Sequence, residues 1–259
     1  MIDRRGQPGF SPGRMGLLLP LAGRFGWKGI LILLVVLFLL GRGFLSGTSG
    51  PSDTETGTGD DDLTSFVGFV LDDSQAYWER NFLKEGRHYQ PADLVLFTES
   101  TSTRCGYGTA AVGPFYCPND RKVYIDLDFY RELKERFGAP GDMAQAYVIA
   151  HEVGHHVQAQ RGLLGEGEGK TSSIATELQA DCFAGAWARS TKDRKLLEEG
   201  DIEEALGAAA AVGDDTLQRR TQGRVQPETW THGSSEQRTA WFRRGFESGD
   251  PAVCDTSAE

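Results

Sequence analysis

The sequence is poor in the residue types that most often bind transition metals. Its 259 residues include only five histidines and four cysteines, and no two cysteines form a C-x-x-C pair. A cysteine-based zinc ribbon and a dithiol redox motif are therefore excluded. The chain also lacks an excess of basic residues, because 27 lysines and arginines stand against 37 aspartates and glutamates. The formal charge of −10 argues against a nucleic-acid partner, which requires a basic face.

Long apolar runs are lacking except for one, and this run predicts a membrane segment. Every residue from 30 to 40 is apolar. A helix needs about 20 apolar residues to cross a bilayer, so the run is short by itself. Phe44 and Leu45 extend it, and Arg42 can snorkel. No small-x-small cleavage site follows Leu40, which favours an uncleaved signal anchor over a removed signal peptide or a buried core helix.

The charges on the two sides of this run predict its orientation. Basic residues precede the run and acidic residues follow it, a pattern that keeps an N-terminus in the cytoplasm. We therefore expect a disordered, cytoplasmic basic tail over residues 1–28 and a single transmembrane anchor over residues 29–46. A flexible polar linker over residues 47–61 then leads to an extracytoplasmic folded domain at the cell membrane, over residues 62–254.

The four cysteines agree with an exported domain, because disulfides persist in oxidising compartments. Four cysteines allow three pairings, and the sequence alone does not choose between them. Proximity favours Cys105 with Cys117, which leaves Cys182 with Cys254.

Hydrophobic periodicity predicts an α+β fold with a mainly helical C-terminal part. A helix begins near Asp62, and strands are expected at residues 93–97, 112–116 and 122–127. Further helices are expected at residues 143–161, 176–188, 201–213 and 235–247. Asp142 and Ser234 each begin a pattern that is typical of a capping box.

The predicted helix at residues 143–161 carries the strongest chemical signal. His151 and His155 are separated by four positions, so they lie about 40° apart on one face of a helix and can bind the same ion. Glu152 follows the first histidine and can take a proton from a water molecule at the metal. His156 is rotated by about 100° from His155 and is not expected to be a ligand. A pair of solvated histidines is disfavoured, because the neighbouring residues are apolar.

A catalytic zinc site needs a third protein ligand and an open position. Glu177 is the candidate ligand, and Asp181, one helical turn later, can accept the free ring N–H of His151. The alternative is that both are surface carboxylates. His232 precedes a helix and is the candidate group for stabilising an oxyanion. Together these residues predict one Zn²⁺ per chain.

Eight segments resemble the neutral zinc metallopeptidases, a bacterial family, across residues 62–254. The segments are FVGFVLDD (66–73), CGY (105–107), VGPFYC (112–117), KVYIDL (122–127), AYVIAHEVGHHV (146–157), ELQADC (177–182), GDIEE (200–204) and THGSSEQR (231–238). The layout is also similar to the gluzincins, whose H-E-x-x-H and E-x-x-A-D motifs supply two histidine ligands, one glutamate ligand and a supporting aspartate. The resemblance implies a zincin-like domain with a small mixed or antiparallel sheet packed on the active-site helix. Some membrane-associated gluzincins carry a T-H-P segment, in which Gly233 replaces the proline here.

We therefore predict a membrane-anchored zinc metalloendopeptidase of the bacterial envelope that acts on a peptide or protein substrate. An extended peptide could lie against the strand at residues 112–116. Two alternatives remain open at this point. One is a non-catalytic binding or assembly module with a structural zinc, for which His232 is the candidate fourth ligand. The other is a zinc hydrolase of non-peptide substrates.

Overall fold

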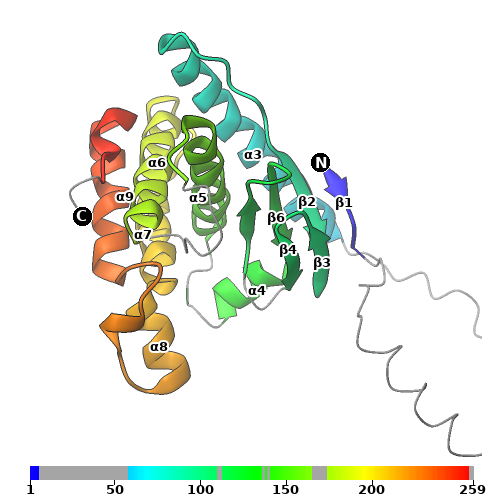
Figure 1. Cartoon of the computed structure of the whole chain (residues 1–259), viewed down its shortest axis with the longest axis vertical. Helices are drawn as coiled ribbons and strands as arrows, with labels where there is room; N and C mark the ends of the chain where they lie inside the picture. The colour runs from blue at the N-terminus through cyan, green and yellow to red at the C-terminus, as the bar shows by residue number, and fades with distance from the viewer. Residues whose placement is uncertain (6–57, 110–112, 136–137, 139–140, 165–173, 257–259) are drawn as a thin grey trace, which may run out of the picture.

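The computed structural model describes residues 1–5, 58–109, 113–135, 138, 141–164 and 174–256 (Figure 1). The predicted anchor at residues 29–46 and most of the predicted linker lie outside these ranges. Among the helices in the described ranges, none has the length and apolar character that a membrane crossing requires. The anchor therefore stays a prediction.

The centre of the N-terminal half is a small mixed sheet of order β1-β2-β6-β5. Strands β1 (Ile2–Asp3), β2 (Asp93–Phe97) and β6 (Lys122–Asp126) are parallel, and β5 (Phe115–Cys117) pairs antiparallel with β6. The strands predicted at residues 93–97 and 122–127 are confirmed to within one residue. The strand predicted at 112–116 begins later, at Phe115, and forms one edge of the sheet.

The two faces of this sheet have different partners, because side chains alternate along each strand. On one face, Leu94 and Leu96 of β2 join the main hydrophobic core. On the other face, Val95 and Phe97 join a smaller cluster with Tyr124 and Cys117. A separate hairpin, β3 (Ser100–Thr103) with β4 (Gly106–Thr109), follows β2. The disulfide Cys105–Cys117 ties this hairpin to β5, as proximity predicts.

Helices form the rest of the domain and bury its main core. The helices preceding and covering the sheet are α3 (Thr58–Lys84), α4 (Asp128–Glu135) and α5 (Asp142–Arg161). The C-terminal part consists of α6 (Ile174–Asp193), α7 (Asp201–Ala211), α8 (Asp214–Gln222), the short η2 (Pro227–Thr229), α9 (Ser235–Ser248) and η3 (Pro251–Cys254). Figure 1 shows α5, α6, α7 and α9 packed side by side, with α5 next to the sheet. The disulfide Cys182–Cys254 joins α6 to η3. The α+β class is confirmed.

Of the two capping boxes predicted at helix N-termini, one is present and one is not. The capping box at Ser234 is present, with the Ser234 hydroxyl accepting the Gln237 N–H and the Gln237 side chain accepting the Ser234 N–H. The capping box predicted at Asp142 is wrong, because Gly141 is the N-cap and makes no side-chain capping bond. Asp142 instead lies in the first turn, where a carboxylate interacts favourably with the helix dipole.

Residues 1–5 were predicted to be disordered, and this is wrong. Ile2 and Asp3 pair with Val95 and Leu96 of β2, and the Arg4 N–H donates to the Leu96 carbonyl at 2.8 Å. The sequence analysis missed this strand because two paired residues are too few to display an alternating pattern.

The closest helix pair, α6 and α9, depends on two glycines that face each other's backbones. A Cβ atom at Gly185 would overlap the Phe242 carbonyl oxygen, and one at Gly245 would overlap the Cys182 carbonyl oxygen. We expect Gly185→Ala and Gly245→Ala each to lower the free energy of unfolding by about 1–3 kcal/mol or more, because the helices must separate. Urea denaturation of the full chain measures this loss. Gly207→Ala on α7 is the control, since its Cβ meets nothing within 4 Å, and a gain of about 0.5–1 kcal/mol is expected.

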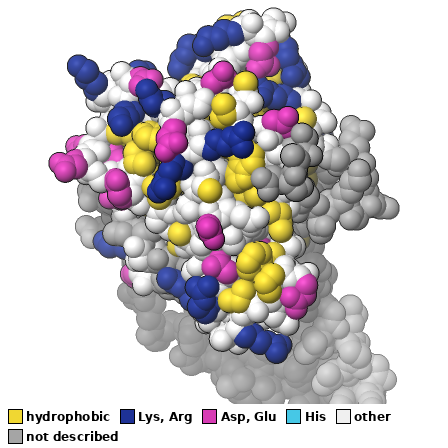
Figure 2. Space-filling view, turned by 90° about the vertical axis from the view of Figure 1, so that its left-hand side faces the viewer, with side chains coloured by type: hydrophobic (Ala, Val, Ile, Leu, Met, Phe, Trp, Pro, Cys, Tyr) yellow, Lys and Arg dark blue, Asp and Glu magenta, His cyan; other side chains and the backbone are white. Residues whose placement is uncertain are grey.

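The outer face of the C-terminal helices carries both positively and negatively charged side chains (Figure 2). Figure 2 shows lysine and arginine side chains interspersed with aspartate and glutamate side chains, and apolar groups between them. A face of this kind does not provide the continuous basic surface that phosphate backbones require. It agrees with the low basic content of the sequence.

Candidate metal centre

Two helices bring the predicted motif residues together. Gly154 of α5 packs directly on α6, and a Cβ atom at this position would lie 3.1 Å from the Ala180 Cα atom and carbonyl oxygen. The small residues in H-E-V-G-H and E-L-Q-A-D therefore allow the helices to approach closely. As a result, the histidines of α5 face the carboxylates of α6.

Three side chains form a group with the dimensions of a zinc site. One ligand atom from each of His151, His155 and Glu177 lies within 4.8 Å of the others. The Nε2 atom of His151 is 3.2 Å from Glu177 Oε2, and the Nε2 atom of His155 is 3.5 Å from Glu177 Oε1. A tetrahedral zinc ion with bonds of about 2.0–2.1 Å separates its ligands by roughly 3.4 Å. The donor set and its spacing thus fit Zn²⁺.

Hydrogen bonds at the other ring nitrogens fix both imidazoles. The Nδ1–H of His151 donates to Asp181 Oδ1 at 2.8 Å, as predicted. The Nδ1–H of His155 donates to Gln158 Oε1 at 2.8 Å. The Gln158 side chain determines the tautomer of His155. Because its amide nitrogen donates to the Thr176 carbonyl, its Oε1 atom faces His155 and can only accept, so Nδ1 of His155 carries the proton. The Nε2 atoms of both histidines therefore face the Glu177 carboxylate. A cation between them would accept both nitrogen lone pairs and offset the carboxylate charge.

A buried cation lies behind these ligands and balances Asp181. The guanidinium of Arg238, on α9, donates to Asp181 Oδ2 at 2.8 Å and to Oδ1 at 2.9 Å. The Tyr147 hydroxyl donates to Asp181 Oδ1 at 2.5 Å and accepts from Arg238 at 3.0 Å. Asp181 is fully buried and Arg238 is 4% exposed. The orientation of His151 therefore depends on residues from three helices.

The electrostatics of the site favour a positive charge at the histidines. Burial lowers the pKa of His151, but the carboxylates of Asp181 and Glu177 outweigh it and raise this pKa to about 9. Burial raises the pKa of Glu177, but the neighbouring His155 and His151 hold it well below its usual range. Negative carboxylates stabilise any positive charge at an imidazole nitrogen. The same surroundings that favour a bound proton there therefore also favour a bound metal cation.

Arg238 is expected to contribute strongly to stability. Replacing it in Arg238→Met leaves the Asp181 carboxylate buried without its guanidinium partner, which should lower the free energy of unfolding by about 3–5 kcal/mol. Arg131→Met is the matched control, because Arg131 pairs with Asp128 on the surface, where loss of an ion pair costs under about 1 kcal/mol. Denaturant unfolding of both full-length variants gives the comparison. Equal small losses would contradict a structural role for the buried pair.

Glu152 is positioned beside the ligand group and not within it. It follows His151 on α5, is buried, and its charge acts to raise the pKa of His155. Among the described residues, the metal-binding group contains no fourth protein ligand. Three ligands, an open position and an adjacent carboxylate are the components of a catalytic zinc site.

Comparison with known proteins assigns the chain to a family. Residues 1–257 match the family described as putative neutral zinc metallopeptidase. The chain belongs to this family. The match covers the described N-terminal strand as well as the metal centre.

Several relatives are similar to this chain over much of their length. The uncharacterized protein YpfJ of Escherichia coli is 44% identical over 274 aligned positions, which cover 98% of this chain and 94% of the relative. The uncharacterized protein Mb2605 of Mycobacterium bovis is 46% identical over 184 positions, covering 65% of this chain and 63% of the relative. No solved structure is significantly similar.

His232 lies in a loop that contacts Asp214 and the start of α6, and it is not part of the candidate ligand group. The N–H groups of Thr231, His232 and Gly233 donate to Asp214 Oδ2 at 2.6–3.0 Å, and His232 Nδ1 is 3.3 Å from Asp214 Oδ1. Gly233 packs against Ile174 at the start of α6. The catalytic role of His232 stays a prediction.

The backbone at Gly233 explains its difference from the T-H-P segment of some gluzincins. Its φ angle is +89°, which proline cannot adopt because its ring fixes φ near −65°. The loop therefore follows a different path from one that contains proline. In this chain the Asp214 carboxylate fixes the loop by accepting its backbone N–H groups.

His156 is buried and is not part of the candidate ligand group, as its rotation around α5 predicts. Its ring contacts the Tyr116 hydroxyl at 2.9 Å and the Gln90 carbonyl at 2.6 Å. Burial lowers its pKa to about 4, so this imidazole is neutral near pH 7. It connects α5 to β5 and to the loop before β2.

The sequence analysis did not assign roles to Tyr147, Gln158, Asp214 and Arg238. A signal existed for two of them, because Tyr147 precedes His151 by one helical turn and Gln158 follows His155 by nearly one turn. Arg238 contacts Asp181, and Asp214 contacts the His232 loop, across sequence separations that spacing does not reveal.

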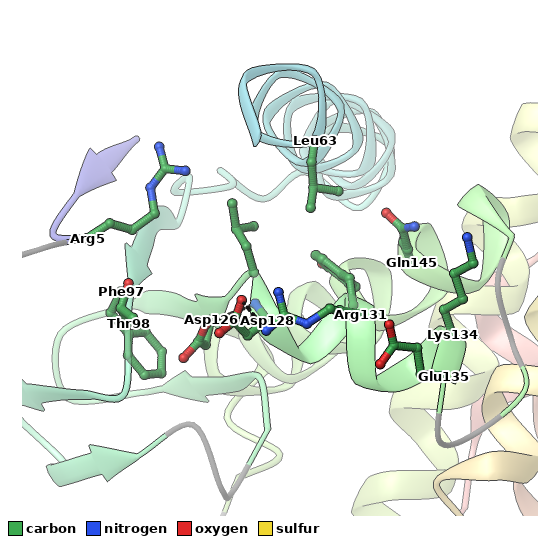
Figure 3. Close-up of a pocket in the computed structure, with 12 residues that line it drawn as sticks. Arg5, Leu63, Phe97, Thr98, Asp126, Asp128, Arg131, Lys134, Glu135 and Gln145 are labelled. Atoms are coloured by element: carbon green, nitrogen blue, oxygen red, sulfur yellow. Dashed lines mark hydrogen bonds and ion pairs between the residues drawn. The ribbon is translucent and has the colours of Figure 1, made fainter. Parts of the chain in front are cut away.

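A cavity of about 360 Å³ lies apart from the metal centre (Figure 3). Its walls include Phe97 and Asp126, at the carboxyl ends of β2 and β6, together with Leu63 of α3 and Gln145 of α5. None of the three candidate ligands lines it. We therefore assign this cavity no part in the proposed reaction.

Proposed function

We propose that this chain is a zinc-dependent peptidase that hydrolyses peptide bonds with Glu152 as general base. The observation that carries the proposal is the three-residue group of His151, His155 and Glu177 with Glu152 beside it. Bound zinc would supply a Lewis acid that polarises the scissile carbonyl and acidifies water. The family assignment supports the same chemistry.

Each residue of the site has a defined task in this proposal. His151, His155 and Glu177 would hold the ion, and Asp181 keeps the His151 ring oriented with its Nε2 atom toward Glu177. Glu152 accepts a proton from the attacking water and returns it to the leaving amine. Arg238 keeps the buried Asp181 ionised, so that it acts as an acceptor.

A structural zinc is the less favoured alternative. A structural site has four protein ligands, whereas the group here has three among the described residues. His232, the candidate fourth ligand, makes its contacts with Thr231 and Asp214 instead. An edge strand also supports a peptide substrate, because β5 has one unpaired side and packs on α5.

The proposal places the folded domain outside the cytoplasm. Both disulfides join segments that pack together in the domain, Cys105 with Cys117 and Cys182 with Cys254. Such bonds persist in oxidising compartments and are rare in the cytosol. The apolar run at residues 30–40 would hold the domain at the membrane.

The test is cleavage of a defined peptide mixture by the full-length chain. We expect near-stoichiometric zinc, peptide cleavage that a chelator abolishes, and recovery when zinc is added back. The Glu152→Gln variant is the control for contaminating peptidases. A chain that binds zinc and leaves every peptide intact would favour the structural alternative or a non-peptide substrate.

A further inference from the structure

The first five residues of the chain occupy the edge of the domain's sheet. β1 pairs in parallel with β2, and the Arg4 N–H extends the pairing to the Leu96 carbonyl. The Arg4 side chain donates to Thr101 Oγ1 at 3.2 Å and to the Ser102 carbonyl at 3.1 Å, both on β3. Figure 1 shows β1 directly beside β2. Main-chain and side-chain bonds together hold this segment at one register.

Apolar packing agrees with that register. Ile2 packs on the smaller cluster, which contains Val95, Phe97 and Tyr124 on the sheet face opposite the main core. Because a shift of one residue would turn Ile2 away from these side chains, the register has a defined energetic preference. β1 thus covers an edge that would otherwise leave β2 unpaired.

The same segment forms one wall of the cavity beside α5. Figure 3 shows Arg5 at one side of this cavity and Gln145 at the other, with Leu63 between them. Gln145 lies on the helix that carries His151 and Glu152. The N-terminal segment therefore lines the same cavity as Gln145 of the helix that carries the proposed active site.

These contacts have a consequence for membrane topology. Strand pairing requires residues 1–5 and β2 to lie in the same compartment, whereas a single crossing at residues 29–46 would separate them. We infer that the N-terminus and the folded domain lie on the same side of the membrane, with residues 1–5 docked on their own domain as its edge strand. The inference replaces the predicted single crossing at residues 29–46 and does not depend on peptidase activity.

Cysteine cross-linking in isolated membranes tests the docking. All four native cysteines form disulfides, so Ile2→Cys with Val95→Cys supplies the free thiols, at paired positions with side chains on one face. After mild oxidation, alkylation and trypsin, we expect the N-terminal peptide ending at Arg4 to be linked to the peptide of residues 88–104. Ile2→Cys with Leu96→Cys is the control, because Leu96 faces the opposite side of the sheet. On the order of tenfold less cross-link is expected for it.

A labelling experiment tests the topology without changing the core. Asp3→Cys and Glu203→Cys each place one thiol at an exposed position, on β1 and α7 respectively. In sealed vesicles, an impermeant maleimide should label both variants or neither, and detergent should make both reactive. Labelling of only one variant before detergent would overturn the inference. A cross-link found only between two chains would overturn docking in cis.

Discussion

The Glu152→Gln variant should lose about 10²- to 10⁴-fold in kcat/KM for peptide cleavage while it retains zinc. The substitution preserves the size of the side chain and removes its ability to accept a proton, and general bases typically contribute this factor. The buried ligand group of His151, His155 and Glu177 is left unchanged. Activity on the best peptide, measured together with metal content, gives the result.

The matched control is Glu203→Gln, which makes the same chemical change on an exposed surface of α7. It should retain full activity. If Glu152→Gln remains within about twofold of the unchanged chain, the proton must be taken by another group and the proposed base is wrong.

The second large effect is expected in zinc affinity. It should be larger for a substitution at Glu177 than for one at Asp181, although both residues lie on α6. Glu177→Ala removes one of three ligands, so the zinc affinity should fall by more than the roughly 10- to 100-fold that loss of a supporting residue costs. Asp181→Asn removes the negative charge that holds the His151 ring and pairs with Arg238, but no ligand, so its loss of zinc affinity should fall within that smaller range. Competition with a chelator of known affinity measures both variants.

This comparison distinguishes a ligand from a nearby carboxylate. Glu203→Ala should keep the affinity of the unchanged chain, since its side chain is exposed on another helix. A Glu177→Ala variant that binds zinc as tightly as Asp181→Asn would remove Glu177 from the ligand set.

The candidate ligand group could be predicted from the sequence because the spacing of its residues matches the helix period. His151 and His155 share a face of α5, and Glu177 and Asp181 share a face of α6. Strands β2 and β6 were recognisable because both are short, apolar and bounded by polar residues or turns. In each case the information lies within a few consecutive residues.

Other features depend on contacts between distant segments, and local patterns do not encode them. Arg238 reaches Asp181 from another helix, and Ile2 pairs with Val95 through the main chain. The unpredicted hairpin β3–β4 is rich in Ser, Thr and Gly, so it has no alternation of apolar and polar residues. The short helices α4 and α8 span only 8 and 9 residues, so a helical pattern has little more than two turns in which to repeat.

The position of Arg238 has a consequence for the order in which activity appears during synthesis. His151 and Glu177 leave the ribosome well before α9, yet the carboxylate that orients His151 is balanced by a guanidinium near the end of the chain. Chains emerge from their N-terminus onward, so a nascent or truncated product lacks this counter-charge. We expect such fragments to be inactive, which would confine proteolysis to finished molecules and protect the cell that makes them.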